Sequence, residues 1–381
     1  MHINSSCQSF LSLSLLLVLG GQHASAKPLS FVPRQAESNS TYVTGPVIDQ
    51  DFPDPCIVYV DGEWWAFATM NADTNIQVAR SSDFKEWTYL DGVDALPDPP
   101  SWVNMSAPNT WAPDVNELDD GTFVMYFSAT SMNDTAIHCI GAATSDTIEG
   151  PYTPVNATLA CPIEQGGAID AAGFKDWETR GSGWGPGGQS SSSNSTTGDD
   201  DDDNCYSNPE WSNGGAGGQR YIVYKVDGNT QGNGGLCGNT IEPIASTPIM
   251  LLAVAADGIT PQGSPIPILD NAGASDDGIV EAPSLIKTWD GQYVLFFSSG
   301  CYSTENYTVS YAISATDVAG PYDRADAPLL QTGDYDLVSP GGMDVHWDAS
   351  AMVFHAQATA VPLVRDMWAA RVRAGDGAVE V

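Results

Sequence analysis

The chain has 381 residues and a formal net charge of −35, which comes from 48 Asp and Glu against 13 Lys and Arg. This charge excludes nucleic acid as a partner, because neutralising phosphates requires clustered Lys and Arg. Anionic membranes are excluded for the same reason. A neutral polymer such as a polysaccharide is compatible with an acidic surface.

Residues 1–26 are predicted to form a signal peptide. The stretch LSLSLLLVLG is apolar but too short to span a bilayer, and Ala24-Ser25-Ala26 is typical of a cleavage site. No other stretch approaches the ~20 apolar residues that a membrane span needs. We therefore expect a secreted, extracellular protein, with residues 27–45 as a flexible polar leader.

Six cysteines remain once Cys7 leaves with the signal peptide. An even number in an oxidising compartment favours disulfides over a metal site, and no CxxC spacing argues otherwise. Several connectivities stay open. The pairing of nearest neighbours gives Cys139–Cys161, Cys205–Cys237 and Cys56–Cys301.

Residues 46–381 are predicted to form one all-β domain, built from a unit that recurs five times. Each unit opens with a carboxylate, passes a short turn and continues into an apolar or aromatic strand. The intervals between the opening acids are 60, 56, 111 and 63 residues. These acids are Asp54, Asp114, Asp170, Glu281 and Asp344.

Self-similarity at this period, with no helix between the strands, predicts a five-bladed β-propeller. The innermost strands of a propeller run in one direction around one axis. We therefore expect the five acids to meet at one end of the channel, where their mutual repulsion would push their pKa values apart. The predicted middle strands of the blades are 63–69, 122–130, 220–226, 292–299 and 351–357.

The long interval contains a low-complexity insertion at residues 181–218, in the third blade. It combines a Gly/Ser tract with five consecutive aspartates at 199–203. Calcium loops space their ligands and turn on glycine, which this run does not do. We interpret the insertion as a solvated, disordered loop without a catalytic role.

Three of the opening acids are candidates for catalysis. Asp54 lies in DFPDP, Asp170 in IDAAGF and Glu281 in VEAPSL. Cleavage of a glycosidic bond requires one protonated and one ionised carboxyl group across a pocket. A third acid beside the proton donor would raise its pKa by like-charge repulsion. The sequence contains no GxSxG or HExxH motif and no catalytic Cys/His pairing that would indicate another hydrolase chemistry.

The order DFPDP, WAPDV, IDAAGF with RYIVYK, VEAPSLIK and a late RDMW resembles glycoside hydrolase family 43. Members of that family are five-bladed propellers that act on arabinan and xylan. The resemblance covers nearly all of the chain after the signal peptide. It implies that Asp54 is the general base and that Glu281 is the general acid. It also implies that Asp170 tunes the pKa and orients the substrate, and that the enzyme inverts the anomeric configuration.

The chain departs from this family in the fifth blade. A His is usual on the axis there, where it often ligates calcium, but this sequence has Gly342 in SPGGMD. His346 and His355 are possible replacements, although a single His in a strand more often just packs. Glycine at this position argues against an axial calcium, and we predict that no cofactor is required.

Three further residues are candidates for substrate binding. Trp111 precedes the second opening acid and could form a wall on which a sugar stacks. Arg365, one of the few basic residues, begins the last strand, and in the family a late Arg reaches toward the sugar. Asp114, like Asp344, is expected to support the site or the structure.

The predicted function is that of a secreted inverting glycosidase, which releases α-L-arabinofuranose from plant cell-wall polysaccharides. Alternatives on the same fold are a β-D-xylosidase and an endo-arabinanase. A retaining enzyme of the fructan-hydrolysing type and a non-catalytic carbohydrate-binding propeller are further possibilities. We expect a monomer whose partner is a polysaccharide or oligosaccharide, with no membrane or nucleic-acid partner.

Overall fold

The computed structural model describes residues 43–177 and 218–381. The predicted signal peptide, residues 27–42 of the predicted leader and residues 181–217 of the predicted insertion lie outside the described residues. The first described element, β1 (Val43–Ile48), begins within the range predicted as the leader. None of the described segments forms a helix long and apolar enough to cross a membrane.

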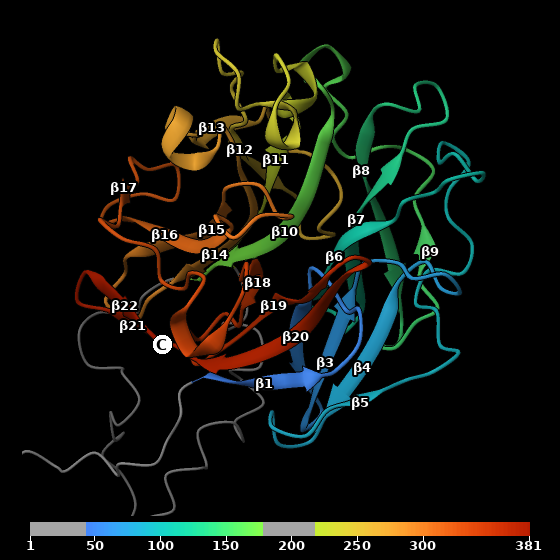
Figure 1. Cartoon of the computed structure of the whole chain (residues 1–381). Helices are drawn as coiled ribbons and strands as arrows, with labels where there is room; N and C mark the ends of the chain where they lie inside the picture. Colours follow the sequence, from blue (N-terminus) through green and yellow to red (C-terminus); the bar gives the residue numbers. More distant parts are fainter. Residues whose placement is uncertain (1–42, 178–217) are drawn as a thin grey trace, which may run out of the picture. The chain divides into compact units, whose positions relative to one another are not determined.

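Five four-stranded antiparallel sheets dominate the described chain, which has only short 3-10 turns besides (Figure 1). Blade 1 comprises β2 (Cys56–Val60), β3 (Glu63–Ala68), β4 (Gln77–Ser81) and β5 (Thr88–Tyr89). Blade 2 comprises β6 (Trp111–Glu117), β7 (Phe123–Thr130), β8 (His138–Ser145) and β9 (Thr153–Pro154). Blade 3 comprises β10 (Ala168–Asp176), β11 (Gln219–Val226), β12 (Ile249–Val254) and β13 (Ile266–Leu269).

Blade 4 comprises β14 (Val280–Lys287), β15 (Tyr293–Ser299), β16 (Thr308–Ser314) and β17 (Asp323–Arg324). Blade 5 comprises β18 (Gly341–Val345), β19 (Ala351–Ala360) and β20 (Leu363–Arg371), with β1 as its outer strand. A small hairpin of β21 (Arg373–Gly375) and β22 (Ala378–Glu380) follows.

The five innermost strands close a ring. Each contacts the next in the order β2, β6, β10, β14, β18, and β18 contacts β2 again. Figure 1 shows β1, in blue, beside β20, in red, so the fifth blade joins the two ends of the described chain. The predicted five-bladed β-propeller is therefore confirmed, and the five predicted middle strands correspond to β3, β7, β11, β15 and β19.

The apolar core is divided into five clusters, one between each pair of neighbouring blades. Phe67 of blade 1 and Phe127 of blade 2 are fully buried in the same cluster. Phe296 of blade 4 and Phe354 of blade 5 are likewise buried together. Burial of each such side chain stabilises the fold by about 1.5–3 kcal/mol, and each blade relies on its neighbours for that burial.

The disulfides agree only in part with the pairing of nearest neighbours. Cys139–Cys161 is confirmed. Cys237 pairs with Cys301 instead, so the predicted Cys205–Cys237 and Cys56–Cys301 bonds are wrong. The reason is spatial: Cys237 lies in the β11–β12 loop and Cys301 in the β15–β16 loop, which belong to neighbouring blades. Among the described cysteines Cys56 is free and buried, because it lies on an innermost strand.

The innermost strands share a backbone feature at their starts. One residue per blade has a left-handed φ, between 42° and 57°. In blades 2 to 5 the pairing with the next strand shifts register at that residue, as at a β-bulge. The five residues are Asp54, Ala112, Asp170, Ala282 and Gly342.

This feature corrects the expectation that the five opening acids are structurally equivalent. Only Asp54 and Asp170 occupy the left-handed position. Glu281 precedes that position by one residue, whereas Asp114 and Asp344 follow it by two. Asp114 and Asp344 therefore lie deeper in the channel than the other three acids.

The left-handed backbone at Ala112 predicts that glycine is tolerated there better than a β-branched residue. A non-glycine residue in the left-handed region costs about 1–2 kcal/mol, and a β-branched residue fits there worst. We expect Ala112→Val to lower the free energy of unfolding by about 1–2 kcal/mol, whereas Ala112→Gly should change it by less than about 1 kcal/mol. Urea unfolding of both variants measures this. Equal losses from Val and Gly would show that the left-handed backbone is not the constraint at this position.

Candidate active site

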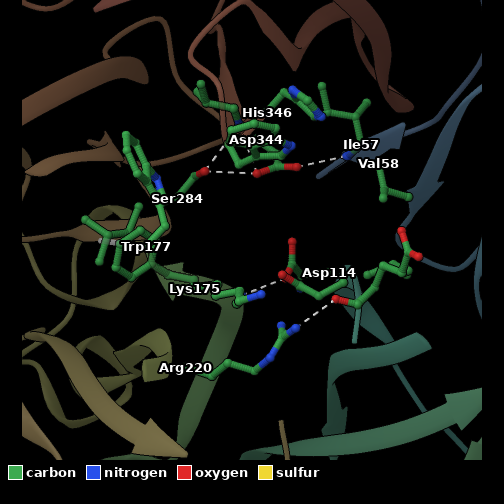
Figure 2. A pocket seen from close by; sticks show the side chains of 17 residues that line it. Ile57, Val58, Asp114, Lys175, Trp177, Arg220, Ser284, Asp344 and His346 are labelled. Atoms are coloured by element: carbon green, nitrogen blue, oxygen red, sulfur yellow. Dashed lines mark hydrogen bonds between the residues drawn. The ribbon is translucent and has the colours of Figure 1, made fainter. Parts of the chain in front are cut away.

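The channel contains two cavities, one after the other along its axis. The first has a volume of about 30 Å³ and lies at the starts of the innermost strands, where Asp54 and Asp170 line it. The second has a volume of about 90 Å³ and lies toward their ends (Figure 2). Asp114 and Asp344 line both cavities. A sugar unit does not fit into about 30 Å³, so a substrate has to lie across the mouth at the first cavity.

Asp54 is held by groups from its own blade and from blade 5. Its Oδ2 accepts a hydrogen bond from Thr69 Oγ1 (2.8 Å), and its Oδ1 lies 3.6 Å from Arg365 NH1. Its backbone N–H donates to His355 Nδ1 (3.1 Å). Thr69 Oγ1 in turn accepts from the backbone N–H of Ala112 (2.9 Å). The side chain of Asp54 remains 19% exposed, so it is fixed in direction but reachable by water.

The ring of His355, on the neighbouring strand β19, lies beside Gly342. A Cβ on Gly342 would come within 2.5 Å of the His355 ring and 2.8 Å of Asp54 Oδ1. Burial lowers the pKa of His355 to about 3, so the ring is neutral, and Nδ1 accepts the hydrogen bond from Asp54. His346, the other histidine considered, lies at the second cavity instead.

The side chains at this position do not fit a calcium ion. His355 uses Nδ1 for Asp54, and imidazole nitrogen is in any case a poor ligand for this hard cation. Within residues 43–177 and 218–381, no group of three or more His, Cys, Asp and Glu side chains is arranged to hold a metal. No step of the chemistry below is routed through a metal.

Asp170 and Glu281 form a second centre beside the first cavity. Asp170 Oδ2 accepts a hydrogen bond from the backbone N–H of Ala282 (3.0 Å), the residue after Glu281. Burial, followed by repulsion from Glu281, raises the pKa of Asp170 well above its usual value. Repulsion from Asp54 also raises the pKa of Asp170, so all three acids interact electrostatically. The structure thus brings the three predicted acids together around one mouth.

Glu281 has a charged partner that the sequence analysis missed. Lys225 Nζ lies 2.9 Å from Glu281 Oε2 and 3.1 Å from Asp227 Oδ1, and the lysine is 1% exposed. Burial alone lowers the pKa of Lys225, but Glu281 and Asp227 hold it above its ordinary value. Tyr307 OH donates to the other oxygen, Oε1 (2.9 Å). A lysine inside the apolar run RYIVYKV was a usable signal, because a buried charge needs a partner.

Asp114 and Asp344 belong to the channel wall rather than to the mouth. Asp114 Oδ2 accepts hydrogen bonds from Gly173 N–H (2.7 Å) and Asn116 Nδ2 (2.5 Å), which links blade 2 to blade 3. Asp344 accepts hydrogen bonds from the backbone N–H of Ile57 and from Ser284 Oγ, as Figure 2 shows. Burial and the field of Asp344 raise the pKa of Asp114 to about 8, and burial raises that of Asp344.

The other two candidate residues lie on opposite sides of the mouth. Trp111 begins β6, and its ring stacks on His138 with the centroids 3.9 Å apart and the planes inclined by 22°. Arg365 lies beside Asp54, and its guanidinium also covers the ring of Tyr302 at 5.4 Å. Both remain candidates for contact with a sugar, Trp111 on blade 2 and Arg365 on blade 5.

Fold and site together define a class: five-bladed propellers whose carboxylates, supplied by different blades, meet at one mouth of the channel. A family model described as glycosyl hydrolases family 43 matches residues 43–198 of the chain. The resemblance to this family is therefore confirmed. A solved structure of a thermostable family-43 glycoside hydrolase superposes with a TM-score of 0.62 and 20% identity. It covers 87% of this chain and 93% of that one.

Two characterised relatives match a shorter part of the chain. The extracellular endo-α-(1→5)-L-arabinanase of Thermotoga petrophila is 30% identical over 132 residues, which is 29% of this chain and 26% of the relative. Xylosidase/arabinosidase 43A of Humicola insolens is 30% identical over 140 residues, 32% of this chain and 39% of the relative. The chain thus matches well under half of the length of these relatives.

The raised pKa of Asp114 predicts a dependence of stability on pH. The folded protein keeps a proton on Asp114 up to about pH 8, whereas the unfolded chain releases it near pH 4. The free energy of unfolding should therefore fall as pH rises through this window, by up to about 1.4 kcal/mol per pH unit. Asp114→Asn keeps both hydrogen bonds and removes the titration. Relative to wild type, it should gain stability steadily from about pH 5 to about pH 8.

Urea unfolding at several pH values measures this difference. Asp326→Asn, an exposed substitution of the same kind, provides the control and should run parallel to wild type. If Asp114→Asn also runs parallel to wild type, Asp114 is ionised in the folded protein and its proposed protonation is wrong.

Proposed function

We propose that this protein is a secreted inverting glycoside hydrolase that cleaves α-L-arabinofuranosidic bonds of plant cell-wall polysaccharides. The observation that carries the proposal is that Asp54 and Asp170 line one small cavity at the mouth, and that Glu281 of a third blade lies close enough to Asp170 to repel its carboxylate. The match to family 43 supports the class of reaction, and the arabinanase and arabinosidase relatives support the sugar. We propose a monomer that needs no cofactor.

Asp54 is the proposed general base. Its two oxygens face different groups, Thr69 on one side and Arg365 on the other, which orients the carboxylate. In an inverting reaction this carboxylate removes a proton from the water that attacks the anomeric carbon. The neutral ring of His355 holds the backbone of Asp54 without adding a charge that would weaken the base.

Glu281 is the proposed general acid, and Asp170 is its partner in holding a proton. Lys225 and Tyr307 bind the two oxygens of Glu281 and fix the direction of its carboxyl group. The raised pKa of Asp170 keeps one proton in the pair. The proposed reaction requires the arrangement in which Glu281 carries this proton. Glu281 then donates it to the leaving oxygen as the bond breaks.

A second candidate function is that of a β-D-xylosidase, favoured by the activity named for the Humicola insolens relative. Release of nitrophenol from nitrophenyl arabinofuranoside and nitrophenyl xyloside, together with cleavage of linear α-1,5-arabinan, separates the candidates. Proton NMR of the first product anomer tests inversion. Absence of cleavage of all three substrates would leave a carbohydrate-binding propeller as the better explanation, and the same anomer in substrate and product would indicate a retaining enzyme.

The two main acids should respond differently to the leaving group. Glu281→Gln removes the proton donor, so we expect a loss of roughly 10³-fold in kcat/KM on arabino-oligosaccharides but only about tenfold on nitrophenyl arabinofuranoside. Asp54→Asn removes the base that every substrate needs, so roughly 10³-fold should be lost on both. Steady-state kinetics on the two substrates measures the contrast. Equal losses for Glu281→Gln on both substrates would contradict its role as the acid.

The shared proton predicts the effect of Asp170→Asn on pH dependence. In wild type the raised pKa of Asp170 retains a proton in the pair as pH rises. The substitution removes the repelling carboxylate, so the remaining acid loses its proton earlier and the alkaline limb of the kcat/KM profile should move to lower pH. The acid limb, which reports the base, should move much less. An unchanged alkaline limb would mean that the two groups do not share a proton.

A further inference from the structure

The rim of the mouth exposes apolar side chains. Nine large hydrophobic residues are exposed in the described part of the chain, and eight of them lie on loops at the ends of strands that face the mouth. The exception, Ile266, begins the outer strand β13. Exposed apolar surface gathered on one face usually marks a binding surface. The eight are Met105, Met132, Ile163, Leu236, Ile241, Tyr302, Tyr335 and Val361.

A single side chain, Arg365, lies between Tyr302 and the candidate base Asp54. The guanidinium of Arg365 covers its ring at 5.4 Å, and the same guanidinium lies 3.6 Å from Asp54 Oδ1. The ring is nevertheless 42% exposed. An exposed aromatic side chain thus lies one side chain away from the place where bond cleavage is proposed.

The loop that carries Tyr302 is anchored at three points. Cys301, the preceding residue, is bonded to Cys237 in the loop of the neighbouring blade 3. Ser339 Oγ donates to the carbonyl oxygen of Thr304 (2.7 Å). The loop ends at Tyr307, whose hydroxyl binds Glu281. An aromatic ring held in this way loses little conformational entropy when a ligand stacks on it.

We propose that Tyr302 forms a subsite for a sugar unit adjacent to the one that reacts. The assignment rests on the proposed function. The first cavity is too small for a sugar, so neighbouring units must extend over the rim. Tyr302 contacts Arg365, which lies beside the proposed base Asp54. Its loop ends at Tyr307, whose hydroxyl binds the proposed acid Glu281, so the ring of Tyr302 borders the reacting position. A tyrosine ring suits the apolar face of a neutral pentose, and the surrounding carboxylates disfavour an anionic sugar.

Calorimetric binding to a catalytically silent protein tests the subsite. In a Glu281→Gln background, we expect Tyr302→Ala to weaken the binding of α-1,5-arabinotriose about tenfold, which corresponds to about 1.4 kcal/mol. Xylotriose is titrated in parallel, in case the substrate is a xylan. Binding of the monosaccharide arabinose should not change, because it needs only the central position. Tyr302→Phe keeps the ring and should bind the trisaccharide like the parent.

Tyr335→Ala is the matched control, since Tyr335 is 48% exposed on the same face but contacts the C-terminal residue Val381 rather than the site. It should leave trisaccharide binding unchanged, and thermal melting checks that each variant is folded. If Tyr302→Ala binds the trisaccharide as well as the parent does, the subsite is refuted while the proposed function stands. If no trisaccharide binds even with Tyr302 intact, and wild type cleaves neither arabinan nor xylan, both proposals fall together.

Discussion

The left-handed residue at the start of every innermost strand is the constraint on which the site depends. This conformation recurs five times around the axis, and in blades 2 to 5 a bulge-like register shift accompanies it. Where the left-handed residue is Asp, as at 54 and 170, the carboxyl group stays at the mouth. Where it is Ala or Gly, the site gains space instead, and Gly342 leaves room for the ring of His355. The same backbone geometry therefore carries a carboxyl group in two blades and a small residue in the other three.

Charge balance then distinguishes the acids that this geometry brings together. Lys225, which Asp227 shares, lies 2.9 Å from Glu281 Oε2, whereas the carboxyl group of Asp170 accepts a backbone hydrogen bond from Ala282 and feels Lys225 only through its field. Burial and repulsion from Glu281 raise the pKa of Asp170, and the charge of Lys225 offsets this rise only in part. Asp54 is more exposed and has an arginine at a looser distance. Three carboxyl groups of nearly equal intrinsic acidity thus acquire three different electrostatic environments.

The fold was predictable from the sequence because the middle strands are strongly apolar and recur at a regular period. The register of the innermost strands was not, because a bulge moves a side chain by one position and leaves no clear mark on the sequence. Asp114 and Asp344 were therefore placed at the mouth, although they lie deeper. Lys225 and His355 were overlooked or set aside because their partners are far away in the chain. The Cys237–Cys301 bond joins two loops that only the ring makes adjacent.

The pairing of β1 with β20 has a consequence for how the protein forms. β1 ends at Ile48 and its partner begins at Leu363, so the first blade-forming strand of the described chain has no edge to join until almost the whole sequence has been synthesised. The closing step must bring together segments more than 300 residues apart, which is costly in loop entropy and slow relative to local hairpins. Until then the apolar faces that blades 1 and 5 pack against each other stay exposed. The newly made chain thus passes through an open form with two exposed sheet faces, in which association with a second copy competes with closure.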